Sequence, residues 1–469
     1  MLNRMRYDRH RCFSKILWAV ERLQGVVNYS QLEEITDLIM QTMTGPWRFF
    51  HTPEHIFEVG GEEDPIEVLA ALFHDLVYVQ VDMGMNINVC RYLAPYVVDR
   101  GGQLWLVEQD REDQLFDLAI AIFGLEKHQP LLIMQGQNEF LSALVCLQTL
   151  KNMLCLSHLA QITACIEATI PFRGRSACGD ATGYIVEQSV SDLLVMRLIS
   201  VNIEFALGWN QDQIKQVVKR AVRVANRDIG NFASPSPAHF LDNTWNLLPE
   251  TNHELLNINT YTVQGYRLSL QKMEGFMNFL TPDLVFRQYA DEPPDHLYAR
   301  YLQATDYNLQ VARLYLGAKL VAVAIIEALA SQIGKEVPLS TMMGELPDRS
   351  DLNVCEPLGL EQFLPQISPR HTFHNRIEKT VYELLAKGRT AESPYDVKHS
   401  PVATFLVRYL GFDQVRSLLV TAKRFFKGEI TAVEYLQAID PYVLQAIIAA
   451  TVALFDARRN ALASTLQKL

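Results

Sequence analysis

Phe50-His51-Thr52-Pro53-Glu54-His55 is followed by Phe73-His74-Asp75, in which His74 stands nineteen residues after His55. Three histidines and one aspartate therefore fall within 25 residues of a chain that has only 12 histidines in 469. Imidazole and carboxylate groups together suit a divalent cation. The two segments predict a metal site, and we expect the fold to form around it.

The residues around the first two histidines predict the start of a helix. Thr52 is a suitable N-cap, and Pro53 suits the first helical position. His55 then falls in the first turn, and His51 lies just outside the helix. We therefore expect His51 near the metal without facing it from the same helical turn.

The second segment, residues 68–78, is apolar except for His74 and Asp75. Burying this pair in an apolar helix costs free energy unless a partner satisfies both side chains, and a shared cation would do so. A lone histidine on an apolar helix is more often a hydrogen-bonded core residue. The metal interpretation therefore requires a further carboxylate from a distant part of the chain.

The overall charge argues against nucleic acid as a partner. The chain carries 42 lysines and arginines against 53 aspartates and glutamates, a formal net charge of −11. This balance offers no basic surplus for a phosphate backbone. With 49% hydrophobic residues the chain has enough apolar side chains for a large core, and its length suggests two or three domains.

Cysteine usage and hydropathy predict a cytoplasmic protein. The seven cysteines are scattered and form no C-x-x-C pair, which is typical of a reducing compartment. No apolar run of the signal-peptide type follows the basic N-terminus. The most apolar stretch, residues 314–333, contains Lys319 and Glu327, which favours a buried helix over a membrane span.

Helical periodicity recurs along the chain, and no convincing run of alternating strands interrupts it. There is no repeat of 20–50 residues. The pattern predicts an all-α fold. The expected helical segments are residues 13–45, 86–98, 113–123, 139–170, 184–207, 211–226, 263–280 and 297–333.

The composition changes towards the C-terminus. Residues 334–370 are richer in Gly, Pro, Asp and Ser, and amphipathic helices resume at Thr372. We therefore expect a metal-binding domain over residues 1–335, a linker or loop excursion over 336–371, and a C-terminal helical region over 372–469.

Two loops carry further candidate residues. A helix ends in a polar loop within residues 223–232, and Asp228 lies at that junction. Arg173 and Arg175 lie on a Gly-containing loop and are candidates for phosphate contact, because a guanidinium matches phosphate geometry. Such a pair is more often solvated surface, and both interpretations stay open.

These segments resemble the HD superfamily of metal-dependent phosphohydrolases, and most closely its cyclic-nucleotide phosphodiesterase branch and the bacterial relatives of that branch. Residues 50–55 are similar to the Y-H-N-x-x-H start of those relatives, and residues 73–75 to the signature His-Asp dipeptide. Residues 225–231 resemble the A-x-D-I-x-N segment, and Gly275-Phe276 resembles the Gly-Phe of the base-clamping helix. The blocks follow the family's order.

The resemblance implies an HD-type helical bundle with an additional C-terminal helical region. It implies a divalent metal ion, with Mn, Fe, Zn and Mg left open, whose ligands are His55, His74, Asp75 and Asp228. It also implies that His51 donates a proton to the leaving group rather than binding the metal. Asn231 and Phe276 fall in the segments that would contact the substrate.

Three positions depart from the family pattern. Tyr78 stands where the branch has the last histidine of H-D-x-x-H, and Ile170 stands where the A-T-D block has an acid that helps a second metal. Met273 stands where a glutamine grips a purine, and a thioether lacks the paired donor and acceptor of an amide. We therefore expect no strong preference for 3′,5′-cyclic AMP or GMP over simple phosphoesters.

The expected function is hydrolysis of a phosphodiester or a nucleotide-like phosphate by metal-activated water. Asp228 would receive the water's proton and His51 would act as the general acid. The partner is then a small-molecule phosphoester or nucleotide, and a homo-oligomer is left open. Two alternatives remain: a catalytically degenerate HD protein that binds metal or nucleotide and regulates a partner, and a helical scaffold in which the cluster is structural.

Overall fold

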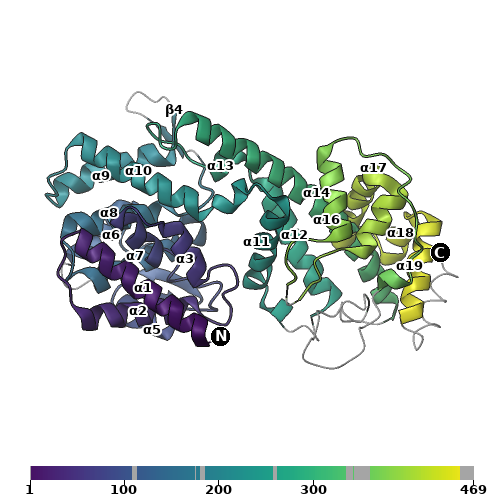
Figure 1. Ribbon diagram of the computed structural model, residues 1–469, viewed down its shortest axis with the longest axis horizontal. Coiled ribbons are helices and arrows are strands. Elements are labelled where there is room, and N and C mark those ends of the chain that lie inside the picture. The colour runs from purple at the N-terminus through teal and green to yellow at the C-terminus, as the bar shows by residue number, and fades with distance from the viewer. Residues whose placement is uncertain are drawn as a thin grey trace. The chain divides into compact units, whose positions relative to one another are not determined.

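The computed structural model describes residues 2–107, 113–174, 176–179, 185–256, 261–333, 342, 360–393 and 395–454. Helices make up most of these segments, so the predicted all-α class is confirmed (Figure 1). The chain divides into two compact units. Unit 1 comprises Met1–Ala233 and Thr281–Gln303, and unit 2 comprises Ser234–Leu280 and Ala304–Leu469.

Unit 1 is a helical bundle with one helix at its centre. Its helices are α1 (Leu2–Arg22), α2 (Tyr29–Met43), α3 (Pro53–Gly60), α4 (Pro65–Phe73), α5 (Ile87–Leu93), α6 (Gln114–Phe123), α7 (Gln137–Leu150), α8 (Leu156–Ala168), α9 (Val190–Glu204), α10 (Gln211–Asp228) and the short α13 (Pro282–Val285). The central helix is α8, which contacts α4, α6, α7 and α10. Most residues of α8 are buried by these neighbours, so the helix is stable only when other helices cover it.

The sequence of α10 contains both a capping signal and the spacing of an amphipathic helix. Asn210 caps its start in a reciprocal capping box with Gln213. Apolar residues then recur at helical spacing and are buried, whereas charged and polar residues, chiefly lysine, arginine and glutamine, occupy most of the other positions. The buried positions include Ile214, Val217, Val218, Ala221, Val222 and Ala225. The helix ends at Asp228, so its last turn carries that carboxylate into the bundle.

Two short hairpins correct the expectation that the chain has no strands. β1 (Val97–Arg100) pairs antiparallel with β2 (Gln103–Leu106), and β3 (Ser176–Gly179) with β4 (Ile185–Gln188). The first hairpin turns at Gly101 and Gly102, which adopt φ of +66° and +86°. Such values favour glycine, and two glycines between strands are a hairpin signal. The helix expected over 86–98 therefore ends at Leu93.

Three expected helices have different bounds in the structure. The helix expected over 68–78 ends at Phe73, and the one expected over 139–170 is divided between α7 and α8. Residues 297–333, expected as one or two helices, belong to the single helix α14 (Asp295–Ile333). By length and composition Asp295–Gln332 passes as a candidate membrane span, but 83% of its apolar window is buried, as in a core helix.

Unit 2 is also helical. It contains α11 (Pro237–Thr251), α12 (Val263–Phe279), most of α14, α16 (Arg376–Lys387), α17 (Pro401–Phe426), α18 (Ala432–Gln437) and α19 (Pro441–Leu454). Single 3-10 turns occur at η1 (Ile133–Gln135) and η2 (Gly230–Ala233) in unit 1, and at η3 (His253–Leu256) and η4 (Leu360–Gln362) in unit 2.

The division into two units does not fall at residue 335, where the composition of the sequence suggested a boundary. A buried carboxylate explains the difference. Asp396 Oδ2 accepts hydrogen bonds from Lys319 at 2.9 Å, Trp245 Nε1 at 2.6 Å and the Tyr266 hydroxyl at 2.7 Å. These donors come from α14, α11 and α12. The helices on both sides of the expected linker therefore share one interior, and residues 234–280 and 304–333 group with the C-terminal helices.

Candidate metal centre

Four side chains converge at one place in unit 1. His55, His74, Asp75 and Asp228 each offer a nitrogen or oxygen atom, and these atoms lie within 4.8 Å of one another. His74 Nε2 is 2.9 Å from Asp75 Oδ2 and 3.3 Å from Asp228 Oδ1. His55 Nε2 is 3.3 Å and 3.1 Å from the same two oxygens. The structure thus brings together all four predicted ligands, although Asp228 lies 154 residues beyond His74.

The ends of three helices position these side chains. Thr52 has the extended backbone of an N-cap, with φ −105° and ψ 170°, and Pro53 is the first residue of α3, as predicted. His55 lies in the first turn of α3. His74 is the C-cap of α4, and Asp228 is the last residue of α10. These three helices contact one another, so the site forms where they meet.

His74 is held in one orientation by the main chain. Its Nδ1 lies 2.8 Å from the carbonyl oxygen of Ala71, and its side chain is only 1% exposed. In the neutral ring this contact places the hydrogen on Nδ1 and leaves the Nε2 lone pair facing the two aspartates. Fixing one ring nitrogen through a carbonyl is the usual way in which a protein orients a histidine ligand.

Asp75 is the clearest sign that the four groups face a common point. Its Oδ2 is buried and accepts no hydrogen bond, although Nε2 of both His55 and His74 lies within 3.3 Å. The ring nitrogens are therefore near this oxygen without pointing along a hydrogen-bond direction. A buried polar atom without a partner is rare, and a bound cation would satisfy it.

The main chain at Asp75 is anchored by a buried arginine. Arg48 has a side-chain exposure of 0%, and it pairs with Asp82 at 2.7 Å. The same guanidinium donates to the carbonyl oxygen of Asp75 at 2.7 Å. Arg48 was not among the residues predicted from the sequence. Its position two residues before Phe50 is the only feature of the sequence that places it near the site.

A second ionic cluster fixes α10 against the other two helices. Glu67 on α4 is almost fully buried and pairs with Arg223 and with Arg227, each at 2.6 Å. Arg227 also donates to the carbonyl oxygen of Val59 on α3 at 2.6 Å. Because Arg227 directly precedes Asp228, these contacts fix the end of α10 at the site.

The charges of the centre balance for a divalent cation. Burial lowers the pKa of His55, but its hydrogen bond with Asp228 and the charges of Asp228 and Asp75 outweigh this effect and raise the pKa to about 9. The same groups raise the pKa of His74 well above its usual value against the effect of burial. Burial favours the neutral form of both aspartates, yet the histidines bring the two carboxyl pKa values below normal. One divalent cation would replace two protons without changing the net charge.

His51 lies beside the centre and is not one of its four converging groups. Its Nε2 is 3.9 Å from Asp75 Oδ2, and its ring contacts the rings of His55 and Tyr78, with centroids 5.7 Å and 4.7 Å away. His51 therefore lies next to the four converging groups, and its role as a proton donor rather than a ligand stays a prediction. Tyr78, which departs from the family pattern, packs against His51.

The remaining predicted site residues lie in different places. Asn231 is half-buried in η2, three residues after Asp228. Arg173 is not solvated surface, because it pairs with buried Glu167 at 2.6 Å. Arg175 lies outside the described residues. Phe276 is on α12 of unit 2, whereas the centre is in unit 1, so its role as a substrate contact stays a prediction.

Two further charged residues near the centre were missed by sequence analysis. Burial raises the pKa of Glu139 to about 7, and the charges of Asp75 and Asp228 act in the same direction. Burial lowers the pKa of Arg287 to about 9, although the charge of Asp228 opposes this. Both residues stand in ordinary helical or loop sequence, and no spacing pattern singles them out.

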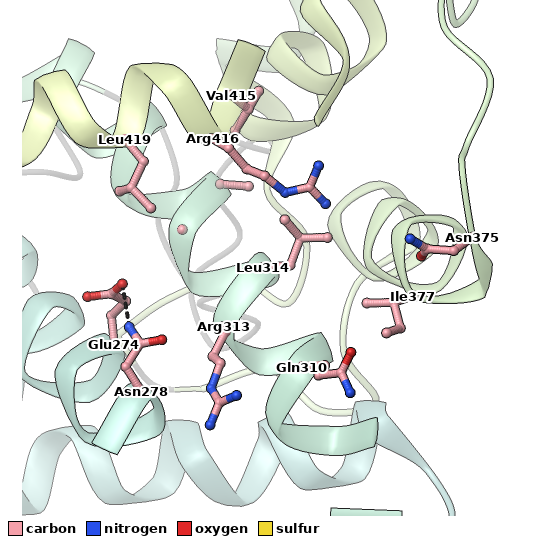
Figure 2. Close-up of a pocket in the computed structure, with 12 residues that line it drawn as sticks. Glu274, Asn278, Gln310, Arg313, Leu314, Asn375, Ile377, Val415, Arg416 and Leu419 are labelled. Atoms are coloured by element: carbon pink, nitrogen blue, oxygen red, sulfur yellow. Dashed lines mark hydrogen bonds between the residues drawn. The ribbon is translucent and has the colours of Figure 1, made fainter. Parts of the chain in front are cut away.

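A concave region in unit 2 offers no comparable chemistry. A cavity of about 340 Å³ lies between α12, α14, α16 and α17 (Figure 2). Its acid, Glu274, already bonds Asn278 at 2.6 Å and Lys423 at 2.7 Å. Arg416 on its rim pairs with Glu378 at 2.8 Å. Since these charges are partnered within the protein, the lining indicates no particular ligand.

Comparisons with protein-family models, with curated proteins and with solved structures found no match to this chain. The functional argument therefore rests on the geometry and chemistry of the centre itself.

Proposed function

We propose that this protein is a metal-dependent phosphoester hydrolase of the HD type. The observation that carries the proposal is the convergence of two imidazoles and two carboxylates from three helix ends, with one buried carboxylate oxygen left without a hydrogen bond. This donor set suits Mn, Fe, Zn or Mg. The side chains of Asp75 and Asp228 remain 14% and 15% exposed, so the centre is not fully closed to solvent.

The ion would supply Lewis-acid activation of water and of a phosphoryl oxygen. The protein's residues account for the proton movements. Water adds its oxygen to phosphorus, and Asp228 takes the proton that the water loses. The bond between phosphorus and the leaving oxygen breaks, and His51 gives that oxygen a proton. His51 suits this role because it lies 3.9 Å from Asp75 and outside the ligand group.

A metal-binding protein without catalysis is the main rival, since Tyr78 and Ile170 replace two groups of the resembling family. The test is hydrolysis of nitrophenyl phosphoesters by the full chain after chelation and after reloading with Mn²⁺, Fe²⁺, Zn²⁺ or Mg²⁺. We expect about one ion per chain and activity that returns only with the ion. Stoichiometric metal without hydrolysis of either a mono- or a diester would establish the rival.

His74→Ala provides the site-specific test, because it removes a fixed ligand. The matched control is His374→Ala, which removes an exposed histidine paired with Asp413 at 3.4 Å in unit 2. Metal content should fall in the first variant and stay unchanged in the second. Equal metal content in both would place the ion elsewhere.

A further inference from the structure

Glu167, in the last turn of α8, is surrounded by more positive charge than it neutralises. Its side chain is 1% exposed, and its Oε1 pairs with Arg173 at 2.6 Å and with Arg197 at 2.8 Å. The charge of a third arginine, Arg287, also acts on this carboxyl group. Three guanidinium groups therefore lie around one carboxylate, so positive charge exceeds negative charge at this point.

Arg287 is held by the main chain and makes no direct ion pair with any of the described residues. Its Nη1 and Nη2 donate to the carbonyl oxygens of Ala168 and Ile170, at 2.6 Å and 2.5 Å. Its own main chain exchanges two hydrogen bonds with the Asn226 side chain, at 3.0 Å and 2.9 Å. These bonds fix the guanidinium in place but do not cancel its charge.

The surplus charge lies next to the metal centre. Asn226, which holds Arg287, precedes Asp228 by two residues on α10, and the charge of Asp228 acts on Arg287. Glu139 experiences the charges of Arg173 and of both aspartates of the centre. Arg173 Nε is buried and has no hydrogen-bond partner, so Arg173 can still donate one hydrogen bond to an acceptor.

We propose that Arg173 and Arg287 form an anion subsite beside the metal centre, which binds a dianionic phosphoryl group, with Glu167 as the residue that positions Arg173. The assignment rests on the proposed phosphoester hydrolysis and specifies its substrate class as phosphate monoesters. Ile170, where the resembling family has an acid for a second metal, here contributes a carbonyl oxygen that holds a guanidinium. A fixed cation of the protein thus takes the place of a second ion.

Charge explains the preference for monoesters. A phosphate monoester carries about −1.5 to −2 charges at pH 7, whereas a diester carries about −1. Two guanidinium groups attract a dianion more strongly than a monoanion, and Arg173 Nε still has a hydrogen to donate to a phosphate oxygen. A diester leaves part of the positive charge unpaired and brings a second ester group towards buried charges.

Anion binding to the full chain tests the subsite without relying on catalysis. Calorimetry on protein freed of metal compares inorganic phosphate with dimethyl phosphate, a monoanionic diester. Unaltered protein should bind inorganic phosphate at least about tenfold more tightly. Arg173→Gln should weaken phosphate binding about tenfold or more. The matched control, Arg197→Gln, removes the other arginine from Glu167 Oε1 and should change the affinity by less than about threefold.

Circular dichroism verifies that each variant is folded. If Arg173→Gln does not fold, the comparison of the two anions on unaltered protein still decides the matter. Equal affinity for the two anions, or equal loss in the two arginine variants, would overturn the subsite. A chain that binds phosphate through Arg173 but takes up no metal and hydrolyses no ester would instead refute the proposed function and leave the subsite standing.

Discussion

Each unit buries a carboxylate among groups that carry positive charge, but the two sites are built differently. In unit 2, Asp396 Oδ2 accepts from an ammonium, an indole and a phenol, all at 2.9 Å or less. In unit 1, Asp75 Oδ2 has two imidazole nitrogens within 3.3 Å and accepts no hydrogen bond. The first oxygen has hydrogen-bond donors on its neighbours, whereas the second faces the same point as the two imidazole nitrogens and has no donor.

The difference separates structural burial of charge from functional burial of charge. A buried carboxylate with matched donors stabilises the fold mainly because removing it would leave its partners uncompensated. A buried carboxylate without donors is a cost that a bound ligand relieves. Substitutions in unit 2 should therefore change stability, and substitutions in the metal centre should change binding and activity.

Asp75→Asn should have the largest effect of all on function. The amide removes a charged ligand, so we expect metal affinity to fall by more than about 100-fold and hydrolysis to be lost with it. The free energy of unfolding of the metal-free protein should change far less. Metal titration followed by calorimetry checks the first expectation, and urea denaturation the second. Unchanged metal affinity would contradict the assignment of Asp75.

Asp396→Asn should reduce the stability of the fold and leave metal binding unchanged. Lys319 and Arg389 lie 2.9 Å and 3.7 Å from Asp396 and are almost fully buried. The change leaves Lys319 without its carboxylate, and it leaves Arg389 with Asp242 alone, at 3.7 Å. We expect a loss of about 3–5 kcal/mol in the free energy of unfolding, measured by urea denaturation. Metal content per folded chain should stay the same.

A matched control for that change is Asp413→Asn, which alters an exposed aspartate paired with Arg416 in the same unit. Surface pairs of this kind contribute little, so its stability should stay close to that of the unaltered protein. Similar losses in the two variants would show that burial of Asp396 is not the cause.

His51→Ala tests whether His51 acts as a general acid rather than as a metal ligand, because His51 lies beside the four converging residues and is not one of them. A general acid assists a poor alkoxide leaving group far more than a nitrophenolate. The variant should lose about 10²–10⁴-fold of its rate on an alkyl phosphate and little on the nitrophenyl ester, while retaining its metal. Equal losses on the two esters, or loss of metal, would remove His51 from the acid role.

The sequence predicted the centre because its four converging residues stand in short motifs with fixed spacing. Thr52 and Pro53 also marked the start of α3 correctly, since capping depends on neighbouring residues. Arg48 and Arg287 could not be found in this way. Each donates to main-chain carbonyl oxygens far along the chain, and carbonyls carry no sequence signal.

The difference between local sequence signals and contacts between distant residues also explains why the predicted boundaries of units and helices differ from those in the structure. The domain limit at residue 335 followed a change in composition, whereas the units follow contacts such as that between Lys319 and Asp396, 77 residues apart. The first hairpin was missed although Gly101-Gly102 is a local signal, because the flanking strands have only four residues each. Short strands show too little alternation to compete with helical periodicity.

Substitution of Glu139 should change the free energy of unfolding least of all. The pH dependence of its contribution should be opposite in sign to that of Asp396. The pKa of Glu139 is raised to about 7 by burial and by the charges of Asp75 and Asp228. Burial also favours the neutral form of Asp396, but Lys319 and Arg389 bring the pKa of this carboxyl below its ordinary value. A raised pKa means that the contribution of Glu139 to stability is complete below its unfolded pKa and is lost as the pH rises through 7. A lowered pKa means that the contribution of Asp396 is lost as the pH falls through its folded pKa.

Glu139→Gln should therefore stabilise metal-free protein at pH 8 by about 1 kcal/mol, an amount reduced by the solvent that reaches this half-buried side chain, and should have little effect at pH 4.5. Chemical denaturation at the two pH values measures the difference. Adding metal should diminish the benefit at pH 8, because a cation at the centre offsets the charges of Asp75 and Asp228 and so favours ionised Glu139. A benefit that is equal at both pH values, or unaffected by metal, would mean that Glu139 does not sense the charge of the centre.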